Sequence, residues 1–157
     1  MASSGGPDAR QGDGMFLGEH QHTLDEKGRI VLPAKHRQGL ADGLVLTKGQ
    51  DRCLYVFPIE RWNEEVSRVN ALPRTDRRAR NFARAFFAGA DRQNLDSQGR
   101  ITVPPHLRDY AGLGREVKVL GGGDRVELWD VGTWETVQPE ADEYYAGIEE
   151  ALSDHGI

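Results

Sequence analysis

"LDEKGRIVLP" occupies residues 24–33, and the chain repeats it with few changes as "LDSQGRITVP" at residues 95–104. Each copy holds an aspartate, a glycine three positions later and then an arginine. The aspartate side chain can accept hydrogen bonds from the backbone of a tight turn, and glycine adopts a positive φ without steric cost. We therefore predict the same turn twice, each followed by a β-branched strand that stops at a proline. The turn-forming residues are Asp25, Gly28, Asp96 and Gly99.

The similarity extends well beyond the turn. With a gap of one residue, residues 48–62 resemble 121–134, and each copy ends in a tryptophan, so the repeat unit spans 19–62 and 91–134. Two copies are fewer than a stacked solenoid needs, which favours a pair related by a pseudo-twofold axis around one closed core. Because a unit this small is not stable alone, we expect the two to interleave.

Each unit has the pattern of a strand, the turn, a second strand, a short helix and a hairpin. The short helices are expected to end at Gly39 and Gly112. The glycines at 121–123 are expected to form a hairpin tip, because no P-loop lysine follows them. The expected first strand, helices and hairpins lie within 18–24, 34–40, 105–113, 44–57 and 116–129. The predicted fold class is therefore α+β, mainly β.

Residues 63–90 are expected to form a helical connector between the repeats. Trp62, Val66 and Val69 are spaced as one apolar stripe of a first helix. A second helix is expected after Thr75 as its N-cap, with Phe82 and Phe86 on a shared face.

The two ends of the chain differ in composition from the repeats. Residues 1–14 lack an apolar segment of the secretory type and are expected to be a flexible extension. Residues 135–157 are expected to form an acidic helix and tail opened by Pro139. Its expected buried side holds Tyr144 or Tyr145, Ile148 and Leu152.

The charge distribution permits an anionic partner despite a net charge of −5. Residues 135–157 hold seven acidic residues and no lysine or arginine, so the rest of the chain sums to +2. A polyanion responds to the local field within about 8–10 Å rather than to the total charge. No apolar run approaches the roughly 20 residues that span a bilayer. The single Cys53 excludes an internal disulfide and favours a reducing compartment.

Arg29 and Arg100, each directly after a turn glycine, are the candidate DNA-binding residues. The arginine fork suits phosphate oxygens and guanine edges, and a two-stranded ribbon fits the major groove. The competing interpretation is that each arginine pairs with the aspartate four positions earlier and only locks the turn, and the residues favour the two equally. Lys27 favours binding by the first copy, whereas Gln98 weakens the second.

Other candidate chemistry is weaker. His20 and His22 lie on one face of a strand, yet no third ligand has a recognisable spacing, so no metal site is predicted. His36 and His106 lie one position out of register between the repeats, which argues against a catalytic pair. The arginines of residues 74–84 are better explained by a solvated or subunit-facing helix than by DNA contact. No catalytic motif, cofactor or small-molecule substrate is predicted, and we do not expect an enzyme.

Together these residues resemble the MraZ family, bacterial transcriptional regulators with two tandem SpoVT/AbrB-type domains. "MFLGEHQHTLDEKGRIVLPAKHR" at 15–37 is similar to the opening of that family. "LDSQGRITVPPHLRDYAGL" with "VELWD" and Trp134 is similar to its second domain. The resemblance covers residues 15–152 and implies that Met15 corresponds to the usual start of the family.

The resemblance implies a swapped-hairpin β-barrel with added helices, assembled into a ring-like homo-oligomer. It also implies an autorepressor in the cytoplasm, on the nucleoid, that binds short direct repeats in the promoter of the division and cell-wall gene cluster. The DNA-contacting arginine of the family falls on Arg29, with Lys27 beside it and Arg100 as the internal counterpart.

Two alternatives to this function remain open. An AbrB-type antitoxin would need a disordered toxin-binding tail, and the expected helix with aromatic residues after Trp134 argues against it. An oligomeric scaffold that binds no DNA is the alternative from a different class, in which the arginines only lock the turns.

Overall fold

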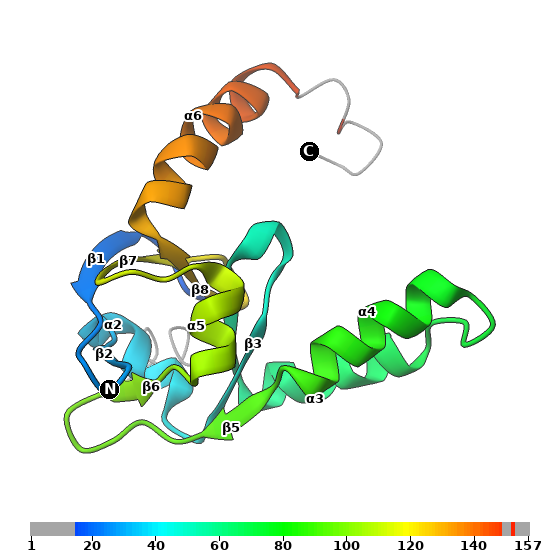
Figure 1. Cartoon of the computed structure of the whole chain (residues 1–157), viewed down its shortest axis with the longest axis horizontal. Helices are drawn as coiled ribbons and strands as arrows, with labels where there is room; N and C mark the ends of the chain where they lie inside the picture. Colours follow the sequence, from blue (N-terminus) through cyan, green and yellow to red (C-terminus); the bar gives the residue numbers. More distant parts are fainter. Residues whose placement is uncertain (1–14, 149–151, 153–157) are drawn as a thin grey trace, which may run out of the picture.

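A computed structural model describes residues 15–148 and Leu152 (Figure 1). The expectations for residues 1–14, and for the tail beyond Ile148 except Leu152, lie outside the described residues. The strands are β1 (Glu19–Thr23), β2 (Arg29–Val31), β3 (Leu44–Lys48), β4 (Leu54–Pro58), β5 (Asp91–Gln93), β6 (Arg100–Thr102), β7 (Glu116–Gly121) and β8 (Val126–Asp130). The α-helices are α2 (Ala34–Arg37), α3 (Ile59–Asn70), α4 (Arg77–Ala88), α5 (Pro105–Ala111) and α6 (Val131–Gly147). Short 3₁₀ turns occupy η1 (Gln38–Leu40) and η2 (Gln50–Arg52).

One antiparallel sheet interleaves the two repeats. Its strand order is β1-β7-β8-β4-β3-β5, so each repeat places its hairpin between strands of the other. The remaining strands, β2 and β6, pair antiparallel as a separate two-stranded ribbon. The expected hairpins β3–β4 and β7–β8 and the α+β class are confirmed.

The strand registers show a pseudo-twofold relation between the repeats. Ile30 lies opposite Ile101 in the ribbon, and Tyr55 lies opposite Glu127 at the centre of the sheet. In both pairs the two residues occupy equivalent positions of the two repeats. The same axis therefore relates the ribbon and the sheet, which explains why the turn is present twice.

The expected closed barrel is not found in the described residues, where the sheet is open with β1 and β5 at its edges. A side chain blocks backbone pairing between β5 and the ribbon. The amide of Gln93 accepts from the Thr102 N–H and donates to the Thr102 carbonyl, both at 2.8 Å. These two bonds use the backbone groups that a continuous ladder would need, so the ribbon lies against the sheet without joining it.

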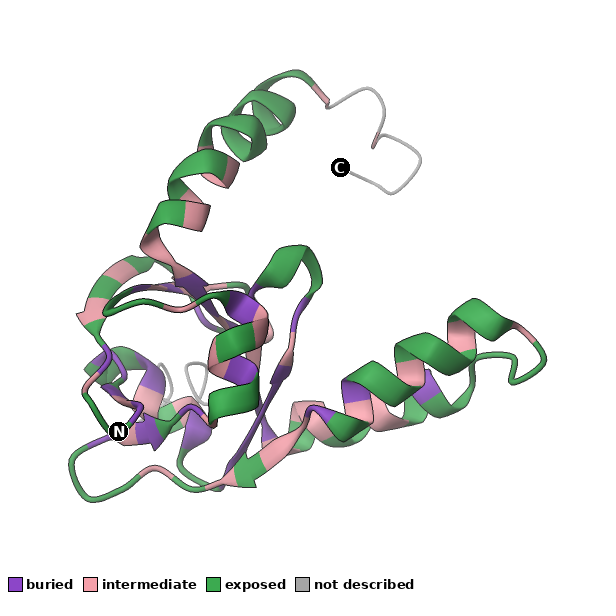
Figure 2. Ribbon diagram, viewed as in Figure 1, coloured by how far each residue is buried: buried purple, intermediate pink, exposed green. Residues whose placement is uncertain are grey.

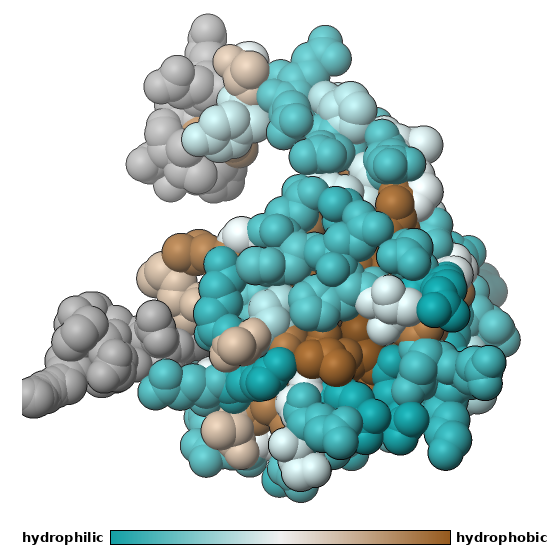
Figure 3. Space-filling model, turned by 90° about the vertical axis from the view of Figure 1, so that its left-hand side faces the viewer, coloured by the Kyte–Doolittle hydropathy of each residue, from teal (hydrophilic) through white to brown (hydrophobic). Residues whose placement is uncertain are grey.

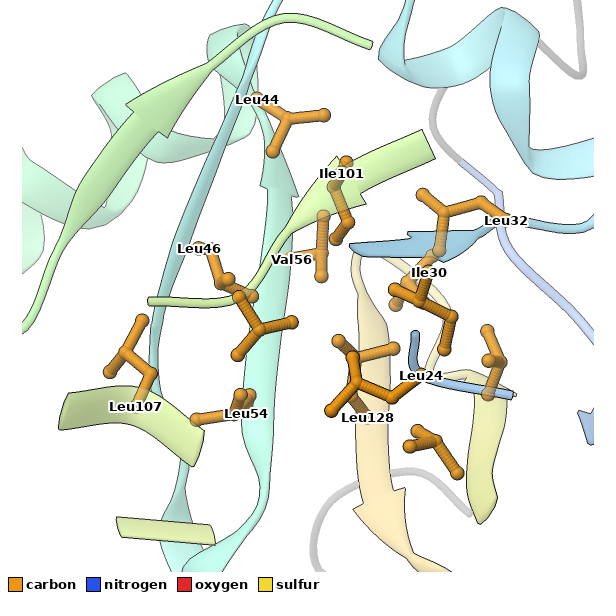
Figure 4. Packing of buried hydrophobic residues seen from close by; sticks show 14 of the residues in the cluster. Leu24, Ile30, Leu32, Leu44, Leu46, Leu54, Val56, Ile101, Leu107 and Leu128 are labelled. Atoms are coloured by element: carbon orange, nitrogen blue, oxygen red, sulfur yellow. The ribbon is translucent and has the colours of Figure 1, made fainter. Parts of the chain in front are cut away.

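The core lies between the ribbon and the sheet and draws on both repeats (Figure 4). Ile30 and Ile101 point inward from the ribbon toward leucines of the sheet such as Leu128, and each is 1% exposed. Full burial of such a side chain stabilises the fold by roughly 1.5–3 kcal/mol relative to exposure. Leu32 and Val103, which follow the two ribbon strands, are also fully buried. The repeat thus places apolar residues at matching sites of one shared core.

Helices α3 and α4 form an antiparallel hairpin that projects from the body, here called the arm (Figure 1). A small cluster of Phe57, Val69 and Phe86 joins it to the sheet, and Trp62 stacks on Phe86 with ring centroids 5.1 Å apart. The prediction of Thr75 as N-cap is wrong. Asp76 caps α4, because its carboxylate accepts the Arg78 N–H at 2.8 Å.

Helix α6 follows β8 directly and projects from the body on a different side from the arm (Figure 1). It does not begin at Pro139, as expected, but at Val131, since Asp130 caps it by accepting the Thr133 N–H at 3.2 Å. The expected burial of tyrosines is also wrong for the isolated chain, where Tyr144 is 59% and Tyr145 87% exposed. No described helix is long and apolar enough to cross a membrane.

Candidate nucleic-acid interface

The first turn, residues 25–29, is held by the Asp25 carboxylate. It accepts the backbone N–H groups of Lys27 at 2.9 Å and Arg29 at 2.8 Å, and the side-chain Nε–H of Arg29 at 2.8 Å. The backbone closes through the Gly28 N–H to the Asp25 carbonyl at 3.0 Å. Gly28 has φ +79°, a left-handed conformation that favours glycine.

The second turn, residues 96–100, has the same geometry. Asp96 accepts the backbone N–H groups of Gln98 and Arg100, both at 2.9 Å, and the Arg100 Nε–H at 2.7 Å. Gly99 has φ +75°. The two sequences therefore fold into one local structure, although only the aspartate, glycine and arginine are shared within the turns.

These hydrogen bonds keep both carboxylates charged. The pKa of Asp25 is lowered, mainly by the backbone hydrogen bond from Arg29. The pKa of Asp96 is lowered to about 2, mainly by the backbone and side-chain hydrogen bonds from Arg100. The structure thus contains the Asp–Arg pairs of the turn-locking interpretation.

The pairing still leaves each guanidinium able to bind a ligand. In both turns the aspartate engages Nε, and within the described part of the chain the terminal nitrogens of Arg29 and Arg100 donate no hydrogen bond. The aspartate therefore orients the arginine and leaves its outer edge available. Turn locking and anion binding are compatible roles for the same side chain.

The ribbon brings the two arginines to one surface. Arg29 lies opposite Thr102 and Arg100 opposite Val31, while Ile30 and Ile101 between them point into the core. Side chains two positions apart share a face of a strand, so Arg29 and Arg100 are diagonal neighbours on the outer face, with Cα atoms about 7–8 Å apart. Sequence reasoning did not foresee that the two turns form one site.

Two further arginines lie beneath the turns, and each comes from the other repeat. Arg37 lies against Gly99, where a Cβ would meet its guanidinium, and its Nε donates to the Leu32 carbonyl at 3.0 Å. Arg108 lies against Gly28, with its Cζ 3.1 Å from the position of a Cβ. The repeat alignment matches Arg37 to Arg108, which was the available signal for this role.

Arg37 and Arg108 supply the positive charge of the site. Turn 25–29 holds two acidic and two basic residues and turn 96–100 one of each, so neither has a net charge. Among the described residues, neither Arg37 nor Arg108 forms an ion pair with a carboxylate. The exposed Lys27 is balanced by Glu26 beside it, so it contributes through its position rather than through a net charge of the turn.

Comparison with known proteins agrees with this duplicated architecture. The family described as "MraZ protein, putative antitoxin-like" matches residues 15–85 and again residues 86–154. The chain belongs to the MraZ family. The two matches divide the chain into tandem MraZ repeats, as the duplicated turn indicates.

Curated members of the MraZ family match over nearly their whole length. "Transcriptional regulator MraZ" of Kineococcus radiotolerans is 49% identical over 88% of this chain and 96% of its own. The protein of the same name from Salinispora arenicola is also 49% identical, over 88% and 97%. That from Halothermothrix orenii is 44% identical over 91% and 100%. The family is one of transcriptional regulators, in agreement with the prediction that the chain is not an enzyme.

The histidines near the first turn form a packed cluster. His20 contacts His22 and His36 edge to face, with ring centroids 6.5 and 5.8 Å apart. Burial is the main cause that lowers the pKa of His36 to about 4 and also lowers that of His22. The described residues contain no group of three or more His, Cys, Asp or Glu side chains suited to a metal ion.

Proposed function

We propose that this protein is a sequence-specific DNA-binding transcriptional regulator whose two turns contact promoter DNA. The observation that carries the proposal is the pairing of β2 with β6, which makes Arg29 and Arg100 diagonal neighbours on the outer face of the ribbon. Membership of a family whose curated members are named transcriptional regulators supports it. Each repeat, 19–62 and 91–134, supplies one turn.

In the proposed complex, Arg29 and Arg100 present their terminal nitrogens to phosphate oxygens or to guanine edges, which match the arginine fork. The hydrogen bond from Nε to the aspartate fixes the fork, so less side-chain entropy is lost on binding. Lys27 contacts phosphate from the tip of the first turn. Arg37 and Arg108 raise the local positive potential without reaching the bases.

We further propose that the protein acts as a homo-oligomer on short direct repeats. A single chain with a few cationic contacts would bind weakly at physiological salt, because each phosphate contact adds about 0.9 to the salt slope. Linked subunits on tandem sites recover affinity through effective concentration. A ring-like autorepressor of the division and cell-wall gene cluster, acting in the cytoplasm on the nucleoid, fits this arrangement.

The competing scaffold role has one observation in its favour, the Asp–Arg pair in each turn. A purely structural pair would not need to leave the terminal nitrogens of its arginine without a hydrogen bond, as both pairs do among the described residues. Solvent-exposed ion pairs contribute only about 0–1 kcal/mol. These two pairs are half-buried, with the Arg29 and Arg100 side chains 32% and 23% exposed, so turn locking is part of their role and does not exclude binding. The antitoxin alternative has only the wording of the family description behind it.

The test is binding of a fluorescent duplex from the DNA upstream of the gene, measured by anisotropy at two salt concentrations. We expect Arg29→Ala and Arg100→Ala each to weaken binding about 10- to 100-fold, because a lost arginine contact costs roughly 1–3 kcal/mol. The double variant should bind no tighter than a random duplex.

The control is Arg78→Ala, which removes an arginine that also pairs with an aspartate but lies away from the ribbon. It should bind as the wild type does. Circular dichroism and sedimentation must show that each variant is folded and assembled. If the double variant passes both checks and binds the promoter duplex normally, the ribbon is not the DNA site and the scaffold role is favoured.

A further inference from the structure

The arm carries a one-sided excess of positive charge. Its helix α4 and the preceding loop hold five arginines between residues 74 and 84, against the single acidic Asp76. These are Arg74, Arg77, Arg78, Arg80 and Arg84. They are exposed on a projecting element rather than on the ribbon (Figure 2). The proposed DNA site therefore leaves this cationic surface unexplained.

Between α3 and α4 the arm has a groove with an apolar floor and a basic rim, and its volume is about 420 Å³. Val69, Leu72 and Phe87 contribute to its floor. Arg74, Arg80 and Arg84 line its rim, and none of the described residues that line it is acidic. A partner for this groove needs an apolar or aromatic side chain flanked by carboxylates.

Helix α6 has the complementary chemistry. It contains four acidic residues and no basic one: Glu135, Glu140, Asp142 and Glu143. Val137, Ala141, Tyr144 and Ile148 follow at the spacing of one helical face, with Glu140 and Glu143 next to Tyr144. In the upper part of Figure 3 this helix stands clear of the body as a mainly hydrophilic column.

Within residues 15–148, no other segment covers the outer half of α6. Residues 139–147 are all exposed, with Tyr144 59% exposed (Figure 2). Most helical stability in proteins comes from packing of one face, and a short isolated helix with an internal proline is unstable in water. Figure 1 shows α6 and the arm projecting from different sides of the body, so one chain does not bring them together.

We propose that α6 of one copy docks in the α3–α4 groove of a second copy. Tyr144 enters the groove, and Glu140 and Glu143 pair with Arg74 and Arg84 on its rim. The exposed part of α6 is about 13 Å long at 1.5 Å per residue, which fits along α4. This inference rests on the oligomer of the proposed function and assigns the surfaces that join its subunits.

The contact uses two different surfaces of each chain, so it joins copies head to tail. Such heterologous contacts close into rings when the rotation between copies permits. Both surfaces lie away from the ribbon, so assembly leaves the ribbon of every copy free for DNA. The arginines of the arm thus serve a neighbouring subunit rather than a nucleic acid.

The test is charge reversal of each surface in the full-length chain, with mass measured by sedimentation velocity without DNA. We expect the arm variant Arg74→Glu/Arg84→Glu and the α6 variant Glu140→Arg/Glu143→Arg each to dissociate into smaller species. Tyr144→Ala should shift the mass in the same direction. The control Arg77→Glu/Arg78→Glu makes the same charge change on α4 outside the groove and should keep the wild-type mass.

Recovery of the oligomer when opposite charges are restored shows that the two surfaces contact each other. A chain carrying all four substitutions restores opposite charges at every contact and should regain the wild-type mass. An equal mixture of the arm and α6 variants restores them wherever the two variants alternate and should regain large species. Wild-type mass in both reversal variants, or dissociation without recovery, overturns the proposed contact. Wild-type mass with lost DNA binding in the arm variant would assign the arm to DNA instead. The variant Arg29→Ala/Arg100→Ala should lose DNA binding but keep the mass of the wild-type oligomer. The DNA-binding proposal and the subunit-contact proposal can therefore fail independently.

Discussion

The turns at 25–29 and 96–100 share one backbone and one Asp–Arg pair, but they differ in their surroundings. The first has Lys27 at its tip where the second has Gln98. In the preceding strand, His22 of the first repeat corresponds to Gln93 of the second. The shared residues fix the turn, whereas the differing residues set how each copy is stabilised and charged.

The difference continues in the core. His36 and Leu107 occupy equivalent positions and are both buried, with exposed fractions of 1% and 0%. The second repeat satisfies this position with an apolar side chain, while the first keeps an imidazole whose Nε2 has no hydrogen-bond partner among the described residues. The comparison therefore predicts that His36 gives the first repeat an acid-sensitive contribution to stability that Leu107 cannot give the second.

The largest expected effect follows from His36. Its pKa is about 4 in the folded chain against 6.5 as an exposed side chain, so the unfolded state binds the proton first as the pH falls. Stability present above pH 6.5 is therefore lost toward pH 4, by about 3 kcal/mol. The pKa values of the turn carboxylates Asp25 and Asp96 are also lowered, so their protonation reduces stability mainly below pH 4.

Urea unfolding at pH 7 and pH 4, at one fixed protein concentration, measures this loss. His36→Leu, which copies the residue of the second repeat, should lose about 3 kcal/mol less than the wild type between these pH values. Equal losses in the two proteins would show that His36 is not the group responsible.

The second effect concerns the turn glycines. Gly28→Ala places a Cβ 2.9 Å from the Val103 carbonyl oxygen at φ +79°. We expect a loss of about 2 kcal/mol, since the left-handed conformation alone costs 1–2 kcal/mol. Gly99→Ala should cost less, because it meets the Arg37 side chain, which can rotate away. Thermal unfolding of the two variants measures which one loses more stability.

Gly112→Ala is the matched control for the glycines. It also has a positive φ, +59°, but nothing lies within 4 Å of its Cβ position. The variant should lose about 1 kcal/mol of stability, which is the cost of the left-handed backbone conformation alone. If all three variants unfolded at the same temperature, the contact between the repeats at Gly28 would contribute nothing.

The smallest effect concerns the loop tips and depends on the proposed DNA role. Lys27→Gln should reduce the dependence of log K on log salt, and Gln98→Lys should increase it, because one phosphate contact changes the slope by about 0.9 per turn engaged. Affinity should change only a few-fold at constant salt. An unaltered slope in Lys27→Gln would remove the proposed difference between the two tips.

Sequence reasoning predicted the turns, the hairpins and the interleaving of the repeats, but it misplaced the starts of α4 and α6 and predicted a closed barrel. The hairpins, the α+β class and the end of α5 at Gly112, which is left-handed, were predictable because each depends on residues close together in the chain. The closed barrel was not found. Whether a ribbon joins a sheet depends on which groups hydrogen-bond the backbone along its edge. Here the Gln93 side-chain amide bonds both the N–H and the carbonyl of Thr102, in place of a strand backbone.

The same division applies to the candidate site. The sequence by itself determined both turns, because the Asp25 and Asp96 carboxylates and the two glycines act within five residues of chain. Only the tertiary structure decided that the turns form one surface, since β2 pairs with β6 across the repeats. It also decided that Arg37 and Arg108 support the turn of the opposite repeat. Local hydrogen bonding is encoded by neighbours, whereas strand pairing depends on how two distant segments bury their apolar faces together.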